Sequence, residues 1–275
     1  MVFSGQPIVD VVLWRCVFGA VPLLIACAAL GLLRRDVITP RQFLLAVLGG
    51  IAIVANWLLL FAAYPLASIS IATAVYNTQP FMLVGFGALF LGERLTRHKL
   101  AWLGIAFAGV VLIANAKAGP GGTDYLSGIA LSLGAAVCYA AAAIITKHLK
   151  GVPPHLIALI QVGVGMLMAA PFANLTHLPT ALDTWLSLAA IGAVHTGLVY
   201  ILLYGAIQKL PTHLIGALSF IYPVVAILVD FVVFGHWLAL PQLVGAAAIL
   251  VAAAGMTLGW KPFDGGRLKA RSASE

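Results

Sequence analysis

Polar and aromatic side chains inside the apolar stretches of this sequence are the residues that could bind a ligand. Two groups of them stand just before a proline: Tyr76, Asn77 and Gln79 before Pro80, and Ser219 and Tyr222 before Pro223. Because proline has no backbone N–H and clashes with the preceding turn, we expect each helix to kink there and to expose a carbonyl group. Two such helices facing each other could line a shared cavity. The alternative interpretation is hydrogen bonding between helices.

Five further residues at compatible depths extend this set: Asn56, Trp57, Tyr139, His195 and Tyr200. Aromatic faces with a few hydrogen-bonding groups suit an uncharged or zwitterionic solute with an apolar or aromatic body. His195 is either a hydrogen-bonded structural residue or a proton carrier or substrate ligand, because its ordinary pKa lies close to neutrality. No Lys or Arg is expected at mid-depth, so the lining does not suit a phosphate.

Three charged residues, Arg15, Glu93 and Asp230, are candidates for gating or coupling. Asp230 lies in the apolar run 219–237, where a carboxylate is costly. Its expected place is about one turn from the outer end of its span, at a depth similar to that of Arg15. Three interpretations stay open for Asp230: an outer ion pair or gate with Arg15, a carboxylate in an outer vestibule reached by water, or a proton carrier.

Glu93 has basic neighbours on the cytoplasmic side of its span. Arg94 is adjacent, and Arg97 lies at the helical i+4 spacing at which opposite charges attract. We therefore expect a structural or gating ion pair at Glu93 and not a contact with substrate.

The composition predicts which kind of chain surrounds these residues. Of the 275 residues, 63% are hydrophobic and only 8% are charged, whereas a soluble domain has about a quarter charged residues. The apolar character extends along the whole length, which excludes a soluble protein behind a signal peptide. The formal net charge of +7 is better explained by basic loops of a membrane protein than by nucleic acid. The sequence predicts an all-α polytopic membrane protein.

A helix needs about 20 apolar residues to cross a bilayer, and nine runs of the sequence meet this requirement. They are 11–33, 42–64, 68–91, 99–116, 125–148, 154–173, 184–206, 212–234 and 241–260. Basic residues fall almost entirely in alternate connections and in the tail, thirteen on one side against only Lys117 on the other. By the positive-inside rule, the side with thirteen is cytoplasmic and includes the C-terminus.

The two halves of the sequence resemble each other. When 76–95 is aligned with 219–238, Pro80 falls on Pro223 and Gly92 on Gly235. Matching spans would cross the membrane in opposite directions, which is the inverted-repeat construction common in secondary transporters. The predicted division is a first repeat at 1–118 with four spans, a second repeat at 119–261 with five spans, and a cytoplasmic tail at 262–275.

The first repeat thus lacks a counterpart of 125–148, which would lie upstream of Met1. Two interpretations remain, a sequence that starts too late or a protein that does without this helix, and we favour the first. With the helix restored, both termini would lie in the cytoplasm.

Three segments resemble a known family: "GERLTRHKLAWLGIAFAGVVLIA", "RCVFGAVPLLI" and "GAVHTGLVYILLYGAIQKLPTHLIGALSFIYPVVAIL". Their order and spacing are similar to those of the EamA-type transporters of the drug/metabolite transporter superfamily. Their amino-acid sequences are similar to those of YddG-like amino-acid exporters. The resemblance implies two inverted five-helix units around a central cavity. The family often has Glu after Gly in both repeats, whereas here Glu93 has His236 as its counterpart.

The resemblance implies a secondary transporter or facilitator that exports small metabolites, most of all aromatic or neutral amino acids, across the bacterial inner membrane by alternating access. The expected partners are a small-molecule substrate and the lipid bilayer, with no nucleic acid, cofactor or metal, and the oligomeric state is open. If export is coupled to protons, the candidate carriers are His195, Asp230 and Glu93. The alternatives are a non-transporting scaffold or regulatory protein and an intramembrane enzyme. The sequence carries no HExxH, GxSxG or phosphate-loop motif that would favour the enzyme.

Overall fold

The computed structural model describes a chain built from helices, with no strand among the described residues. These residues are 6–34, 36–67, 69–115, 125–175, 178–222, 224–225, 232 and 240–261. The helices of the first half are α1 (Ile8–Ala29), α2 (Pro40–Ala67), α3 (Ile69–Tyr76), α4 (Gln79–Leu91) and α5 (Arg97–Asn115). Those of the second half are α6 (Tyr125–His148), α7 (Pro154–Ala169), η2 (Ala170–Phe172), α8 (Leu182–Ala190), η3 (Ile191–Leu198), α9 (Val199–Lys209), α10 (Thr212–Ser219) and α12 (Leu240–Leu258).

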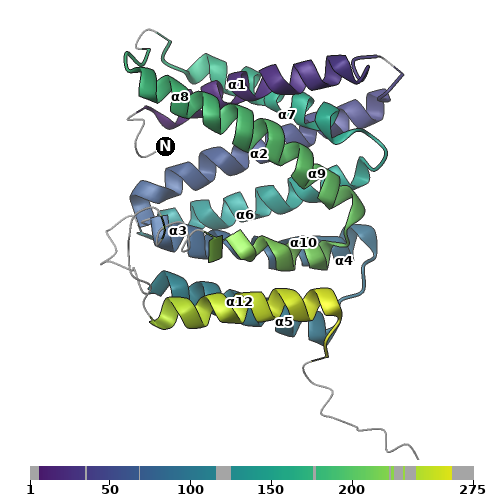
Figure 1. Cartoon of the computed structure of the whole chain (residues 1–275), viewed down its shortest axis with the longest axis vertical. Coiled ribbons are helices and arrows are strands. Elements are labelled where there is room, and N and C mark those ends of the chain that lie inside the picture. The colour runs from purple at the N-terminus through teal and green to yellow at the C-terminus, as the bar shows by residue number, and fades with distance from the viewer. Residues whose placement is uncertain are drawn as a thin grey trace, which may run out of the picture.

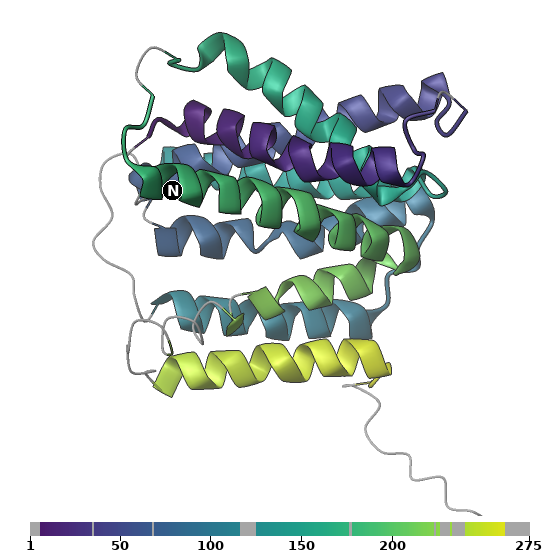
Figure 2. The same cartoon turned by 45° about the horizontal axis from the view of Figure 1, so that its top comes forward.

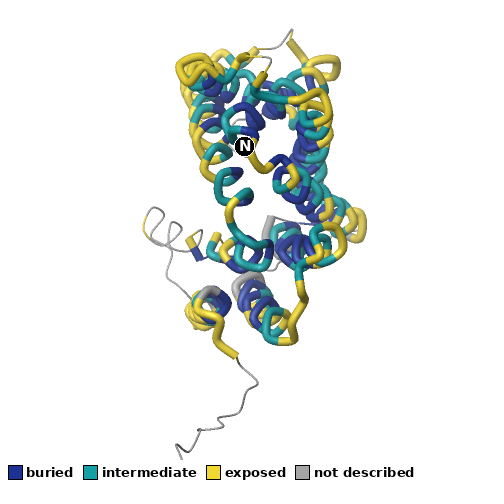
Figure 3. The backbone as a smooth tube through the Cα atoms, turned by 90° about the vertical axis from the view of Figure 1, so that its right-hand side faces the viewer, coloured by how far each residue is buried: buried dark blue, intermediate teal, exposed yellow. Residues whose placement is uncertain are grey.

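The helices lie roughly side by side in a stack (Figures 1 and 2). At one end of the stack α1 packs against α7 and η3, and α2 packs against α6 and α7. Further along, α4 contacts α6 and α10, and at the other end α5 pairs with α12. The core forms where these helices meet, and the exposed residues lie on the outer surface of the stack (Figure 3).

The surface of the stack is strongly apolar. Leu89, Leu126 and Leu167 each leave more than 70% of the side chain exposed, and many other large apolar residues are exposed as well. Such a surface is unsuited to water and suited to lipid. Five helices of the described chain are long and apolar enough to cross a membrane, and α4 and part of α12 are shorter apolar helices. The predicted all-helical membrane fold is therefore confirmed, while the number of spans and the inverted repeat stay predictions.

The kink predicted near Pro80 is present as a break between two helices. α3 ends at Tyr76, Asn77 and Thr78 form a turn, and α4 begins at Gln79. The break has a simple cause, because Pro80 has no N–H to donate to the carbonyl of Tyr76 four residues earlier. In the second half, α10 ends at Ser219, the residue that aligns with Tyr76, while Pro223 itself lies outside the described residues.

The basic connections gather at one end of the helices. The α1–α2, α4–α5, α6–α7 and α9–α10 connections all lie at the same side of the stack, on the right in Figure 1. The α2–α3 and η2–α8 connections lie at the opposite side. This arrangement supports the sidedness predicted from the Lys and Arg residues, which itself stays a prediction.

Glycine lets α5 and α12 approach closely, although not every glycine of these helices lies at the contact. A Cβ at Gly109 would lie 2.6 Å from the carbonyl oxygen of Gly245, and one at Gly255 would lie 2.5 Å from the ring of Trp102. Both positions are therefore sites of close helix packing, a common use of small residues between membrane helices. Gly104 on α5 is not such a position, because a Cβ there would meet nothing within 4 Å.

This difference gives a matched test of the packing. Gly109→Val is expected to destabilise the fold by about 1–3 kcal/mol, because the side chain must push α5 away from α12. Gly104→Val, on the same helix, is expected to leave the melting temperature close to that of the wild type. Thermal unfolding of both variants in detergent measures the difference, and equal melting temperatures would contradict the close approach of the two helices.

Candidate functional site

Asn56 connects three helices at the centre of the candidate site. Its Nδ2 donates hydrogen bonds to the hydroxyl oxygen of Tyr76, at 3.2 Å, and to the carbonyl oxygen of Ala135, at 2.8 Å. The side chain is 2% exposed, so both bonds lie inside the protein. Asn56 on α2 therefore fixes the hydroxyl of Tyr76, at the end of α3, against α6.

Tyr139 extends this group to the second half of the chain. Its ring meets that of Tyr76 edge to face, with 6.4 Å between the ring centroids. Its hydroxyl lies close to the hydroxyl of Ser219. The Ser219 hydroxyl itself donates to the carbonyl oxygen of Ile215 at 2.8 Å. The two groups of residues that precede the prolines are thus joined through one tyrosine.

Trp57 anchors a second group of rings. Its indole Nε1 donates to the Tyr200 hydroxyl at 3.0 Å, and the two rings meet at 88° with centroids 5.7 Å apart. The Tyr200 ring in turn meets that of Tyr204 at 5.1 Å. The Tyr204 hydroxyl donates to Oε1 of Gln161 on α7. We call Tyr76, Tyr139, Tyr200 and Tyr204 the tyrosine cluster, since their rings meet edge to face in two pairs that lie near each other.

Arg15 adjoins the tyrosine cluster from α1. Its Nε donates to Oγ1 of Thr196 at 2.9 Å, and its guanidinium carbon lies 3.9 Å from the centroid of the Trp57 ring. Arg15, a candidate for an outer gate, is 8% exposed and packed beside two candidate site residues. Asp230, its proposed ion-pair partner, lies outside the described residues, so that pair stays a prediction.

Four candidate residues do not join the tyrosine cluster through a recorded hydrogen bond. Asn77 donates to the carbonyl oxygen of Thr73 within its own helix, at 2.7 Å. Gln79 is buried, and its Oε1 has no hydrogen-bond partner among the described residues. His195 and Tyr222 are exposed on the surface of the protein.

Three residues near the site were not predicted: Thr196, Tyr204 and Gln161. Tyr204 follows Tyr200 by four residues, and this spacing places both side chains on one face of a helix. Gln161 is a lone amide in an apolar run, a signal that the sequence does contain. Thr196 carries no such signal, because its hydroxyl would be satisfied within any helix.

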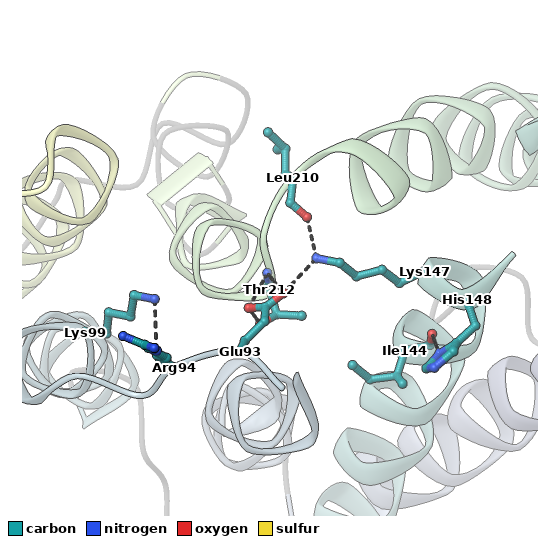
Figure 4. Close-up of polar contacts among 8 residues, drawn as sticks. All are labelled: Glu93, Arg94, Lys99, Ile144, Lys147, His148, Leu210 and Thr212. Carbon is teal, nitrogen blue, oxygen red and sulfur yellow. Dashed lines mark hydrogen bonds and ion pairs between the residues drawn. The ribbon is translucent and has the colours of Figure 1, made fainter. Parts of the chain in front are cut away.

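At the end of the bundle predicted to be cytoplasmic, Glu93 joins both halves of the chain (Figure 4). Lys147 Nζ lies 3.0 Å from Oε1 of Glu93 and also donates to the carbonyl oxygen of Leu210 at 2.7 Å. Both Glu93 oxygens accept from the backbone N–H of Thr212 at 3.2 Å, and Oε2 accepts from the Thr212 hydroxyl. Glu93 thus caps the first turn of α10, where a negative charge is favourable.

The ion pair predicted for Glu93 exists, but its expected partner is wrong. The structure pairs Glu93 with Lys147 on α6, whereas Arg97 is exposed at the start of α5. Burial raises the pKa of the Glu93 carboxyl, but the hydrogen bonds from Thr212 and Lys147 outweigh it and hold that pKa below its ordinary value. The carboxylate is therefore the form that ties the helices together.

Relatives of the chain are transporters by name. An uncharacterized transporter YxxF of Bacillus subtilis is 28% identical over 93% of this chain and 82% of its own length. A protein of Salmonella typhimurium named as a probable amino-acid metabolite efflux pump is 28% identical over 66% of this chain and 64% of its own length. The aromatic amino acid exporter YddG of Ancylobacter novellus is 26% identical over 61% of this chain and 60% of its own length.

A fold comparison and a family profile that matches almost the whole sequence agree with the names of these relatives. One solved crystal structure superposes with a TM-score of 0.79 at 23% identity, covering 93% of this chain and 90% of the other, and shows that the fold is shared. The sequence profile described as the EamA-like transporter family matches residues 2–115 and again 126–258. The chain belongs to the EamA-like transporter family and is an integral multi-pass membrane protein.

Proposed function

We propose that the protein is a secondary transporter or facilitator that exports aromatic or neutral amino acids across the bacterial inner membrane by alternating access, with its C-terminus in the cytoplasm. The observation that carries this proposal is the tyrosine cluster with Asn56 and Trp57, which gathers aromatic faces and hydrogen-bonding groups from four helices. Such a lining suits a small solute with an apolar body and a few polar atoms.

The division of the site between the two halves supports alternating access. Asn56, Trp57 and Tyr76 come from the proposed repeat 1–118, and Tyr139 and Tyr200 from the proposed repeat 119–261. Helices that align in the two halves also pack against each other, as α1 does with α7 and α5 with α12. Movement of one half against the other would change this site, as expected where a substrate binds between inverted repeats.

The amino-acid substrate is supported by the printed names of two relatives, an efflux pump for amino-acid metabolites and an exporter of aromatic amino acids. Both match about two thirds of this chain or less. The substrate therefore has to be tested directly on this protein.

Flux of labelled phenylalanine or tyrosine in proteoliposomes tests the proposal. The wild type is expected to exchange the label well above protein-free liposomes. Tyr139→Phe and Tyr200→Phe are each expected to lower the flux about five-fold, the equivalent of one lost hydrogen bond. A wild type without flux of any amino acid would contradict the proposal and leave a scaffold or regulatory role.

His195 provides a matched control for the same measurement. It was a candidate substrate ligand and proton carrier, but its side chain is exposed and belongs to none of the hydrogen-bonded groups described above. His195→Ala is therefore expected to leave both the flux and its pH dependence unchanged. A shifted pH profile would restore His195 as a proton carrier.

Glu93 is expected to act as part of an inner gate. Glu93→Ala removes the cap of α10 and the partner of Lys147, and should destabilise this arrangement by about 1–3 kcal/mol. Glu93→Gln keeps an acceptor for Thr212 but loses the charge, so it should destabilise the fold less than Glu93→Ala does. The pKa of the Glu93 carboxyl is held below its ordinary value of 4.5. The carboxylate therefore contributes its whole share of the folding stability above pH 4.5, and this share is lost as the pH falls below that value.

Melting temperatures and initial flux rates of both Glu93 variants measure this effect. Arg97→Gln is the control, since it removes an exposed charge at the position first expected to pair with Glu93. If Arg97→Gln proved as destabilising as Glu93→Ala, the Lys147 pair would not be the one that stabilises this end of the protein.

A further inference from the structure

Arg15 is a buried cation whose donors are mostly unused. A guanidinium group has five N–H donors, and a charge inside a membrane protein is costly unless it is paired. The structure gives Arg15 one acceptor, Oγ1 of Thr196, and that bond uses Nε alone. Among the described residues, no acceptor meets either terminal Nη, and no recorded ion pair includes Arg15.

The guanidinium is held in place by close packing of α1 against η3. A Cβ at Gly192 would lie 2.9 Å from the carbonyl oxygen of Arg15, and one at Gly19 would lie 3.0 Å from the Cβ of Thr196. These glycines let the two helices approach until the Thr196 hydroxyl reaches Arg15. η3 is a π-helix, an uncommon form that occurs often at functional sites.

Two contacts orient the guanidinium, and its terminal Nη groups make no hydrogen bond to the described residues. The Nε bond to Thr196 sets its direction, and the face of the Trp57 ring, 3.9 Å away, sets its plane. Such a stacked arrangement over an aromatic ring is itself favourable for a cation. The remaining edge presents N–H donors in the fixed fork that matches a carboxylate bidentately.

The surroundings of Arg15 supply no described negative charge. Tyr200, Tyr204 and Cys16 are its recorded electrostatic neighbours, and all three are neutral in their ordinary state at pH 7. Asp10, on the same helix, accepts a bond from the backbone N–H of Asn174 at 2.8 Å. A carboxylate brought by a ligand would provide the missing counter-charge.

We propose that Arg15 binds the carboxylate of the transported solute, with Trp57 and Tyr200 beside the solute's aromatic or apolar body. This inference rests on the proposed function and narrows it to substrates that carry a carboxylate. It also moves Arg15 from a gating role to substrate recognition. Thr196 is then a positioning residue that acts through Arg15.

Competition against labelled phenylalanine flux tests the inference, with phenylalanine, phenylalaninamide and phenethylamine as unlabelled competitors. The last two keep the aromatic body but lack the carboxylate. In the wild type they are expected to compete at least about ten-fold more weakly than phenylalanine, the effect of a lost charge-assisted bond. Arg15→Gln is expected to lose most phenylalanine flux. In this variant the ratio of the affinities for phenylalanine and for the amide should fall toward one.

Two further variants keep the test informative if Arg15→Gln fails to fold. Arg15→Lys keeps the charge without the fork, so it should retain the preference for the carboxylate at reduced affinity. Thr196→Val keeps the shape of the side chain but releases Nε. It should raise the half-saturating concentration of phenylalanine while leaving the maximal rate and the preference for phenylalanine over the amide unchanged.

The outcomes separate this inference from the proposed function. If the wild type transports phenylalanine but the amide competes equally well, Arg15 does not bind the carboxylate, although the transport function stands. If the wild type transports no amino acid, the proposed function itself fails. If Asp230→Asn restores the flux lost in Arg15→Gln, Asp230 is the partner of Arg15, and the inference is overturned.

Discussion

Every polar side chain buried between these helices has to find its hydrogen-bond partner inside the bundle, because lipid offers none. Asn56 meets this requirement with both of its donor hydrogens, and in doing so ties Tyr76 to α6. Trp57 meets it through Tyr200, and Tyr204 meets it through Gln161. The site is therefore a consequence of the same constraint that holds the helices together, since each bond that satisfies a polar group also joins two helices.

Close approach of the backbones makes these bonds possible, and at the other end of the bundle it sets the Glu93 junction. A Cβ at Gly87 would lie 2.4 Å from Oγ1 of Thr212, so only glycine lets α4 pass this close to the start of α10. Gly92 then ends α4 with φ of +66°, a left-handed conformation that glycine adopts without strain. This reversal of the chain brings the next side chain, Glu93, to the N-terminus of α10. Two glycines and one carboxylate together determine how the halves meet there.

Much of this could be predicted from the sequence, because hydropathy and proline act locally. The apolar runs place most helices to within a few residues, and Pro80 predicts the break before α4. What the sequence alone leaves open depends on helix rotation and tertiary contact. His195 has the chemistry of a site residue, yet the adjacent Thr196 is the one that faces Arg15, since neighbouring residues lie about 100° apart around a helix. Glu93 pairs with Lys147, 54 residues away, and no short-range spacing rule could show this.

Polar groups without a hydrogen-bond partner near the site indicate which kind of ligand it could bind. Arg15 has spare donors, and Oε1 of Gln79 is a buried acceptor with no partner among the described residues. Leaving buried donors and acceptors unmet costs stability, so a helix bundle that keeps them gains by binding a ligand that supplies what is missing. An amino acid carries both kinds of group, a carboxylate that accepts and an ammonium that donates. A zwitterionic solute, as proposed above, would supply partners for groups that packing between the helices leaves without one.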